Sequence, residues 1–253
     1  MNDVKQALGQ VRLEQRAFWR NPQSAFFTFA LPVGLLLIFG AISSGETIPG
    51  RPDIDGLTLF VPGILAFGIV VAAYGTLAGT IAELRAQGVL KRLRATPLRP
   101  GAYLAGHLGS VLTSSIVIAV TTVALGRLVF GVSPRPGGLL PLLASMSLGV
   151  LCLAALGLAI SGFIPSADAA GPITNGTYIP LAIVSGTFSS HLVLPAWLDP
   201  VVRALPIRAL TDGLRAGYDP AVHTWPVGEL AVLAAWAAIG VLLARRYFRW
   251  SPS

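Results

Sequence analysis

Six long apolar segments, separated by short polar stretches, dominate the pattern of hydrophobic and polar positions along the chain. A helix needs about 20 predominantly apolar residues to cross the hydrocarbon core of a bilayer. The segments approach or exceed that length, except the fifth, which is short and contains Pro180. The pattern therefore predicts an all-α integral membrane protein with six transmembrane helices, at residues 25–42, 57–82, 103–130, 139–163, 173–188 and 227–243.

The stretch before the first span, residues 1–24, has its own helical pattern. Val4, Leu8, Val11 and Phe18 recur at helical spacing, and basic residues occupy the other positions. This arrangement is typical of an amphipathic helix that lies in the membrane interface. An ordinary solvated helix on the cytoplasmic side is the alternative.

The connection between the fifth and sixth spans, residues 189–226, is too polar to cross a membrane and too apolar for a loose linker. Pro195, Pro200 and Pro206 divide it into short pieces, and Thr211 with Asp212 suits a helix N-cap. We expect short re-entrant helices on the outer side, because such backbone is tolerated at membrane depth only when packed against protein or facing water.

Composition supports a membrane protein and excludes sites that need several cysteines in one chain. Of 253 residues, 54% are hydrophobic and 11% are charged, whereas soluble domains carry roughly 25% charged residues. Cys152 is the only cysteine, so one chain cannot build a disulfide framework or a cysteine-based metal site. The stretch before the first span is too long and too mixed in charge for a cleaved signal peptide, so we expect that span to be retained.

The distribution of basic residues predicts the orientation in the membrane. The net charge is +7, which in a soluble protein would suggest nucleic-acid binding. In this membrane protein we expect no nucleic-acid partner. Four Lys or Arg residues precede the first span, five lie in residues 83–100 and three follow the last span, twelve of the eighteen. Since cytoplasmic loops are enriched in Lys and Arg, we expect both termini in the cytoplasm.

Catalytic and cofactor motifs are absent from the sequence. GxxxxGK[ST], HExxH and GxSxG do not occur, and Lys5 and Lys91 are the only lysines. We therefore predict no catalytic residue, no metal site and no bound cofactor, and a protein that is not an enzyme. Every acidic residue lies at or beyond a span boundary, which argues against transport driven by protons or sodium ions.

Gly75 and Gly79 form a GxxxG pair in the second span. Small residues at this spacing allow helices to approach closely. Contact within the monomer and a dimer face both remain open.

The charged stretch 83–100 reads ELRAQGVLKRLRATPLRP. A helix here would place Ala86, Val89, Leu90 and Leu93 on one face, with basic residues on the other. One use of such a helix is as a topology anchor that contacts anionic lipid, at about 1 kcal/mol per base. The alternative is a ridge that docks into a groove of a cytoplasmic protein. Physical chemistry alone does not choose between them.

At these residues the sequence resembles a known family. RAQGVLKRLRATPLRP is similar to the REKGTLERLRATPL-type stretch of type-2 ABC exporter permeases, which include daunorubicin-resistance-like and polysaccharide- or lipid-exporter-like proteins. A second match, LPAWLDPVVRALPIRALTDGLRA at residues 194–216, looks like the family's segment before the last span. Ala86 and Lys91 stand where the family commonly has glutamate.

The resemblance implies a division of labour between chains. The 83–100 loop would hold a coupling helix that sits in a separate cytoplasmic ATPase, and that partner would bind ATP and magnesium. Two permeases would pair as a homodimer or a heterodimer in the bacterial cytoplasmic membrane. The coupling residues so implied are Arg85, Gly88, Leu90, Lys91, Arg92, Leu93, Arg94 and Pro97. Those of the outer re-entrant region, which would shield the exit, are Pro195, Trp197, Leu198, Pro200, Pro206, Asp212 and Arg215.

The sequence thus predicts the permease subunit of an ATP-driven exporter for an amphipathic substrate such as a drug, a lipid or a glycan. An ATPase-independent carrier or channel would move its substrate without a partner. A non-transporting membrane scaffold would bind no ATPase at all.

Overall fold

The structure is a computed structural model that describes residues 3–42, 47–48, 51–90, 100–189 and 195–247. Within these residues the fold is helical apart from one two-stranded antiparallel hairpin. Its elements are α1 (Asp3–Arg20), α2 (Pro22–Ala25), η1 (Phe26–Ala30), α3 (Leu31–Ile42), β1 (Thr47–Ile48), β2 (Arg51–Asp55), α4 (Gly56–Val70), η2 (Val71–Thr76), α5 (Leu77–Ala86), α7 (Pro100–Phe130), η3 (Pro136–Gly138), α8 (Leu139–Ser161), α9 (Ala167–Val184), α10 (Asp199–Arg203), α11 (Pro206–Arg215) and α12 (Val227–Tyr247).

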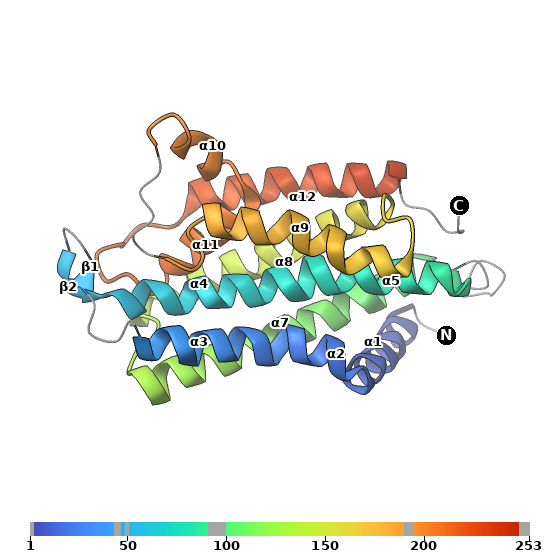
Figure 1. Ribbon diagram of the computed structural model, residues 1–253, viewed down its shortest axis with the longest axis horizontal. Coiled ribbons are helices and arrows are strands. Elements are labelled where there is room, and N and C mark those ends of the chain that lie inside the picture. The colour runs from blue at the N-terminus through green and yellow to red at the C-terminus, as the bar shows by residue number, and fades with distance from the viewer. Residues whose placement is uncertain (1–2, 43–46, 49–50, 91–99, 190–194, 248–253) are drawn as a thin grey trace.

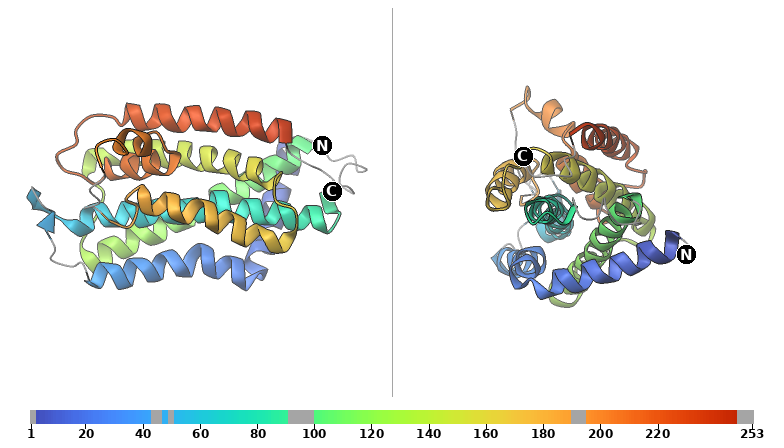
Figure 2. Two further views of the ribbon diagram at one scale, coloured as in Figure 1. Left: turned by 45° about the horizontal axis from the view of Figure 1, so that its top comes forward. Right: turned by 90° about the vertical axis from the view of Figure 1, so that its right-hand side faces the viewer.

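The long helices run along a common axis and form one bundle (Figure 1). One end holds α1, the end of α5, the start of α7 and the end of α12; we call it the terminal end (Figures 1 and 2). The hairpin, α10 and α11 lie toward the opposite end, the hairpin end. The N- and C-terminal helices and both flanks of the basic 83–100 stretch therefore share one end of the bundle.

A continuous helical run, Gly56–Ala86, passes through the centre of the bundle (Figure 2). The side chain of Asp55 caps its start by accepting a hydrogen bond from the Leu57 amide at 3.0 Å. From Phe60 to Ala73 every residue is buried, because α3, α7, α8, α9 and α11 surround the run. The hydrophobic core is centred on this run.

Four helical runs among the described residues are long and apolar enough to cross a membrane: Gly56–Ala86, Gly106–Phe130, Pro136–Ser161 and Val227–Tyr247. The run Phe26–Ile42 is apolar but shorter, and α9 is not among the four. The protein is therefore a multi-pass helical membrane protein, as predicted. Most of α12 faces outward, and only a narrow face with Leu233 and Gly240 is buried.

Two π-helical segments, η1 and η2, lie against each other near the terminal end of the spans. Thr28 Oγ1 and Thr76 Oγ1 are 3.1 Å apart and join them. Pro32, the second residue of α3, crowds the carbonyl four residues earlier, which belongs to Thr28. The wider π turn gives that carbonyl room, so the proline is accommodated without ending the helix.

The fifth apolar segment differs from its predicted bounds. The sequence pattern predicts 173–188, whereas α9 covers Ala167–Val184. Ser166 caps the helix by accepting a hydrogen bond from the Ala169 amide, which starts it six residues earlier. The chain turns at 185–188, so these residues close the span rather than extend it.

The connection before α12 holds short helices, as its prolines predict, but their capping differs from the prediction. Thr211 and Asp212 lie inside α11 and do not cap it. Pro206 begins that helix, where its missing N–H has no intrahelical partner to lose. Thr211 Oγ1 instead donates to the Ile207 carbonyl at 2.9 Å, one turn back. The buried face of α11 packs against α4, α8 and α12.

Candidate functional site

The predicted coupling residues lie only partly within the described chain. Arg85, Gly88 and Leu90 are described, whereas the remaining predicted coupling residues lie outside the described residues: Lys91, Arg92, Leu93, Arg94 and Pro97. The interpretation of the 83–100 stretch therefore depends on its first part and on the helices that flank it.

Within the described residues, the helix that contains Arg85 does not continue to Leu90. α5 ends at Ala86, and Gly88 follows with φ of +68°. A residue without a Cβ adopts this left-handed conformation at little cost, and it commonly ends a helix. Leu90, predicted on a docking ridge, is fully buried in the hydrophobic core. Its described contacts are therefore within this chain.

Arg85 is buried at the terminal end of α5, with 5% of its surface exposed. Its Nη1 donates to the Ser161 carbonyl at 2.7 Å, and its Nη2 donates to the Ile164 carbonyl. Those carbonyls belong to the last residue of α8 and to the turn before α9. Arg85 therefore joins the second predicted span to the connection between the fourth and fifth.

The other flank of the basic stretch, the start of α7, is held by α1. Gln15 Nε2 donates to Ser110 Oγ at 3.0 Å and to Ser114 Oγ at 3.2 Å. Glu14 Oε2 lies 3.2 Å from His107 Nδ1. Burial raises the pKa of Glu14, and the hydrogen bond from Gln10 offsets part of that rise. The face of α1 toward α7 thus combines these polar contacts with Val11, which lies against Gly109, while Trp19 on the same helix is exposed.

A groove opens beside the central run, between η1 and α9. Its cavity is about 490 Å³ and combines small and hydroxyl-bearing residues, including Gly75, Thr76, Gly79, Thr80, Thr174, Asn175 and Tyr178. A second cavity of about 630 Å³, between α1 and α5, shares Thr76, Thr80 and Glu83 as lining. Together the two hollows border the terminal half of the central run.

The two glycines of the GxxxG pair have different surroundings. A Cβ on Gly75 would lie 3.2 Å from the ring of Tyr178, whereas a Cβ on Gly79 would meet nothing within 4 Å. Gly75 therefore packs within the monomer. Gly79 faces the open groove.

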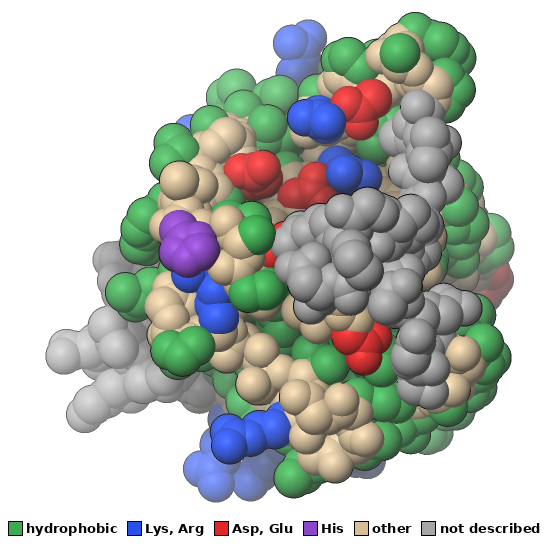
Figure 3. All heavy atoms as spheres, turned by 90° about the vertical axis from the view of Figure 1, so that its left-hand side faces the viewer, with side chains coloured by type: hydrophobic (Ala, Val, Ile, Leu, Met, Phe, Trp, Pro, Cys, Tyr) green, Lys and Arg blue, Asp and Glu red, His purple; other side chains and the backbone are tan. Residues whose placement is uncertain are grey.

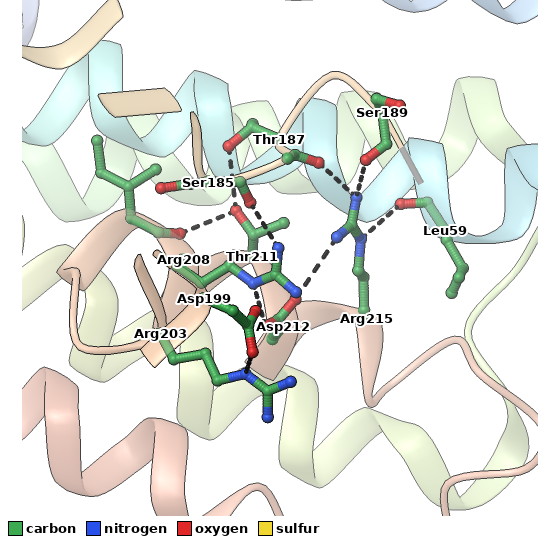
Figure 4. Close-up of polar contacts among 12 residues, drawn as sticks. Leu59, Ser185, Thr187, Ser189, Asp199, Arg203, Arg208, Thr211, Asp212 and Arg215 are labelled. Atoms are coloured by element: carbon green, nitrogen blue, oxygen red, sulfur yellow. Dashed lines mark hydrogen bonds and ion pairs between the residues drawn. The ribbon is translucent and has the colours of Figure 1, made fainter. Parts of the chain in front are cut away.

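At the hairpin end, Arg215 joins three parts of the chain (Figure 4). Its Nε donates to the Leu59 carbonyl at 3.1 Å, and its Nη2 donates to the Gly186 carbonyl at 2.7 Å. Asp212 accepts from Arg215 at 3.5 Å and from Arg208 at 2.5 Å. Burial lowers the pKa of Arg215, and the Asp212 carboxylate offsets part of that shift. The hydrogen bonds of the guanidinium join α4, the turn after α9 and α11.

These charges border a cavity of about 640 Å³ between α11 and the start of α12. Asp219 and Glu229 add carboxylates to its lining, and Trp225 adds an aromatic ring. Acidic and basic side chains lie next to one another on this face, with hydrophobic side chains around them (Figure 3). The hairpin end is therefore polar where the sides of the bundle are apolar.

The predicted outer residues do not form one cluster. Asp212 and Arg215 are brought together. Pro200 is the second residue of the short helix α10, and Pro206 is the first residue of α11. Pro195 and Trp197 lie on the surface, with 74% of Trp197 exposed. Sequence reasoning did not single out Arg208 or Arg85 as internal hydrogen-bond donors, since their partners include backbone carbonyls far along the chain.

Comparison with protein families matches residues 9–218 to the ABC-2 type transporter family. This chain belongs to that family. The matched region contains the hydrogen bonds of Arg85 and Gln15 at the terminal end and those of Arg215 at the hairpin end.

Individual relatives agree with this assignment. The chain is 26% identical over 241 residues to the daunorubicin resistance ABC transporter permease protein of Streptomyces coeruleorubidus. This alignment covers 92% of this chain and 82% of the relative. It is 28% identical over 189 residues to a fluoroquinolones export permease protein of Mycobacterium tuberculosis, covering 73% and 74%. The protein therefore has the role of a transport permease. Its relatives are transport components rather than catalytic subunits.

Proposed function

We propose that the chain is the permease subunit of an ATP-driven exporter and that a separate cytoplasmic ATPase docks on its 83–100 stretch. The observation that carries the proposal is the position and attachment of the two flanks of this stretch. Both lie at the terminal end, and each is hydrogen-bonded to a different helix: α5 through Arg85 and α7 through Gln15. A force on the 83–100 stretch would reach two separate parts of the bundle.

In this proposal the membrane is crossed six times. The four long apolar runs supply four spans. The continuous stretch Pro22–Ile42, through α2, η1 and α3, supplies another, and α9 with 18 residues supplies the sixth. The terminal end is cytoplasmic, because α1, both flanks of the 83–100 stretch and the end of α12 lie there, and the N-terminal, 83–100 and C-terminal segments to which they belong carry twelve of the eighteen Lys and Arg. α1 then lies at the inner interface, and α10 and α11 lie on the outer side.

The groove beside Gly79 is our candidate for the wall of the translocation path. A second permease, of this kind or of another, would cover it and complete a passage between the two chains. Hydroxyl, amide and phenol groups on an otherwise apolar wall suit a substrate that has both polar and apolar parts. Drugs, lipids and glycans are the classes of compound that we propose as substrates.

ATPase docking is tested by reversing charge in the 83–100 stretch. Arg92→Asp together with Arg94→Asp is expected to weaken co-purification of the ATPase about tenfold or more, because like charges replace complementary ones at the contact. Membrane insertion should persist. Arg12→Asp with Arg245→Asp is the matched control, since both residues are exposed and lie at the same end. Equal ATPase binding by the two double variants would contradict docking at this stretch.

The groove is tested with a bulky side chain at Gly79. Gly79→Leu is expected to keep the thermal stability of the monomer, since an added Cβ meets nothing within 4 Å there. It should lower dimer formation and ATP-driven transport about tenfold or more, because a close helix contact tolerates only small residues. Gly34→Leu on α3, equally open in the monomer, is the control. Normal dimerisation and transport by Gly79→Leu would place the path elsewhere.

A further inference from the structure

The resemblance to exporter permeases assigns Arg85 to the surface that contacts the ATPase, but its surroundings lie within the permease. It is buried, and its guanidinium spans two carbonyls, those of Ser161 and Ile164. A carbonyl at the end of a helix has no intrahelical partner, and a guanidinium presents paired donors in a rigid fork. We call these two hydrogen bonds the Arg85 tie.

Apolar contacts reinforce the Arg85 tie on the side toward α9. Ala78 and Ala82 of α5 form a small buried cluster with Ile164 and with Ala170 of α9. Small residues allow the helices to approach closely, so the end of α5 and the start of α9 pack directly. The end of α5, the turn at 162–166 and the start of α9 therefore form one packed unit.

The same turn is also held from the far side. The ring of Phe163 lies 5.0 Å from that of Tyr247 at the end of α12. A side chain on Gly162 would collide with the backbone of Tyr247. The turn therefore contacts both α5 and the end of α12. A displacement of α5 would move the turn against α12.

α9 also forms one wall of the groove, through residues that include Gly171, Thr174 and Tyr178. We propose that Arg85 is a positioning residue that transmits movement of the 83–100 stretch to α9 and thereby changes the width of the groove. This inference rests on the proposed function, and it assigns Arg85 to coupling inside the permease rather than to ATPase binding. The guanidinium is suited to this role because two charge-assisted hydrogen bonds fix both distance and direction.

The test uses the permease with its ATPase in proteoliposomes and compares Arg85→Met with Arg245→Met. Arg245→Met removes one exposed positive charge at the same end and is the matched control. Arg85→Met should lower ATP-driven transport about tenfold or more, because buried charged donors are costly to lose, while ATPase affinity changes less than about twofold. Transport per ATP hydrolysed should fall, a readout that lower protein abundance does not change.

Hydrogen exchange on the permease alone tests the Arg85 tie without any ATPase. Arg85→Met should raise exchange at 162–170 about tenfold, whereas Arg245→Met should leave it unchanged. If Arg85→Met does not accumulate in membranes, Arg85→Lys replaces it. That variant keeps the charge but not the fork, and it should show intermediate transport and intermediate exchange.

Transport per ATP equal to wild type in Arg85→Met would overturn the inference, and so would loss of ATPase binding together with transport. Unchanged exchange at 162–170 would overturn it as well. Absence of ATP-driven transport in the wild-type complex would instead contradict the proposed function. In that case the exchange result still decides whether Arg85 holds the turn.

Discussion

Replacement of Arg215 by leucine is expected to lower the unfolding temperature of the permease strongly and to reduce its accumulation in the membrane. Arg215 bonds to α4, to the turn after α9 and to Asp212 at the hairpin end, and its side chain is 12% exposed. The substitution leaves the Leu59 and Gly186 carbonyls without this donor and Asp212 without one of its two cationic neighbours. Leaving a buried hydrogen-bonding group without its partner costs about 1–3 kcal/mol, so losing the donor to both carbonyls removes a large part of the stability of most proteins.

The matched control is Arg203→Leu, on the neighbouring helix α10. Arg203 also pairs with an aspartate, Asp199, at 2.7 Å, but 70% of its side chain is exposed. Exposed ion pairs contribute about 1 kcal/mol or less. Thermal unfolding followed by size-exclusion chromatography in detergent measures both variants. Equal unfolding temperatures for Arg215→Leu and Arg203→Leu would show that the buried network does not hold the hairpin end.

Gly157→Leu is the second substitution for which we expect a large loss of stability. A Cβ at Gly157 would lie 2.9 Å from the Tyr74 carbonyl oxygen and 3.0 Å from that of Ala73. These are backbone atoms of η2, which cannot rotate away. The side chain would therefore push α8 off the central run, and overpacking in a well-packed core costs about 1–3 kcal/mol or more.

Gly34→Ala serves as the control for Gly157→Leu. It lies on α3, where an added Cβ meets nothing within 4 Å. Since alanine has higher helix propensity than glycine, Gly34→Ala should keep or raise the unfolding temperature. Gly157→Leu should lower it by several degrees or prevent purification. An unchanged unfolding temperature for Gly157→Leu would contradict the close approach of α8 to η2.

The sequence was informative where its pattern is long and repetitive. Apolar length predicts the four long runs. The basic residues predict one shared side for the N-terminal, 83–100 and C-terminal segments, and the described α1, end of α5, start of α7 and end of α12 lie at one end of the bundle. The prolines predict short helices before α12, and α10 and α11 are present. The β1–β2 hairpin is too short to produce a clear alternating pattern, and it was not predicted.

Contacts between residues that lie far apart in the chain could not be predicted from the sequence. Arg85 reads as one of several bases on a charged helix, yet its partners lie more than 70 positions away. Leu90 reads as part of an exposed ridge, but tertiary packing buries it in the core. Thr211 and Asp212 resemble a helix N-cap in the sequence, whereas α11 begins at Pro206 and contains both residues. In each case the side chain's environment depends on which helices become neighbours.

The dependence of transport on a partner ATPase is the central claim of this account. The most direct measurement reconstitutes the permease in liposomes with and without the ATPase and records export of an amphipathic fluorescent compound after ATP is added. We expect export only when both the ATPase and hydrolysable ATP are present. Equal export by the permease alone would contradict the claim and identify an ATPase-independent carrier or channel.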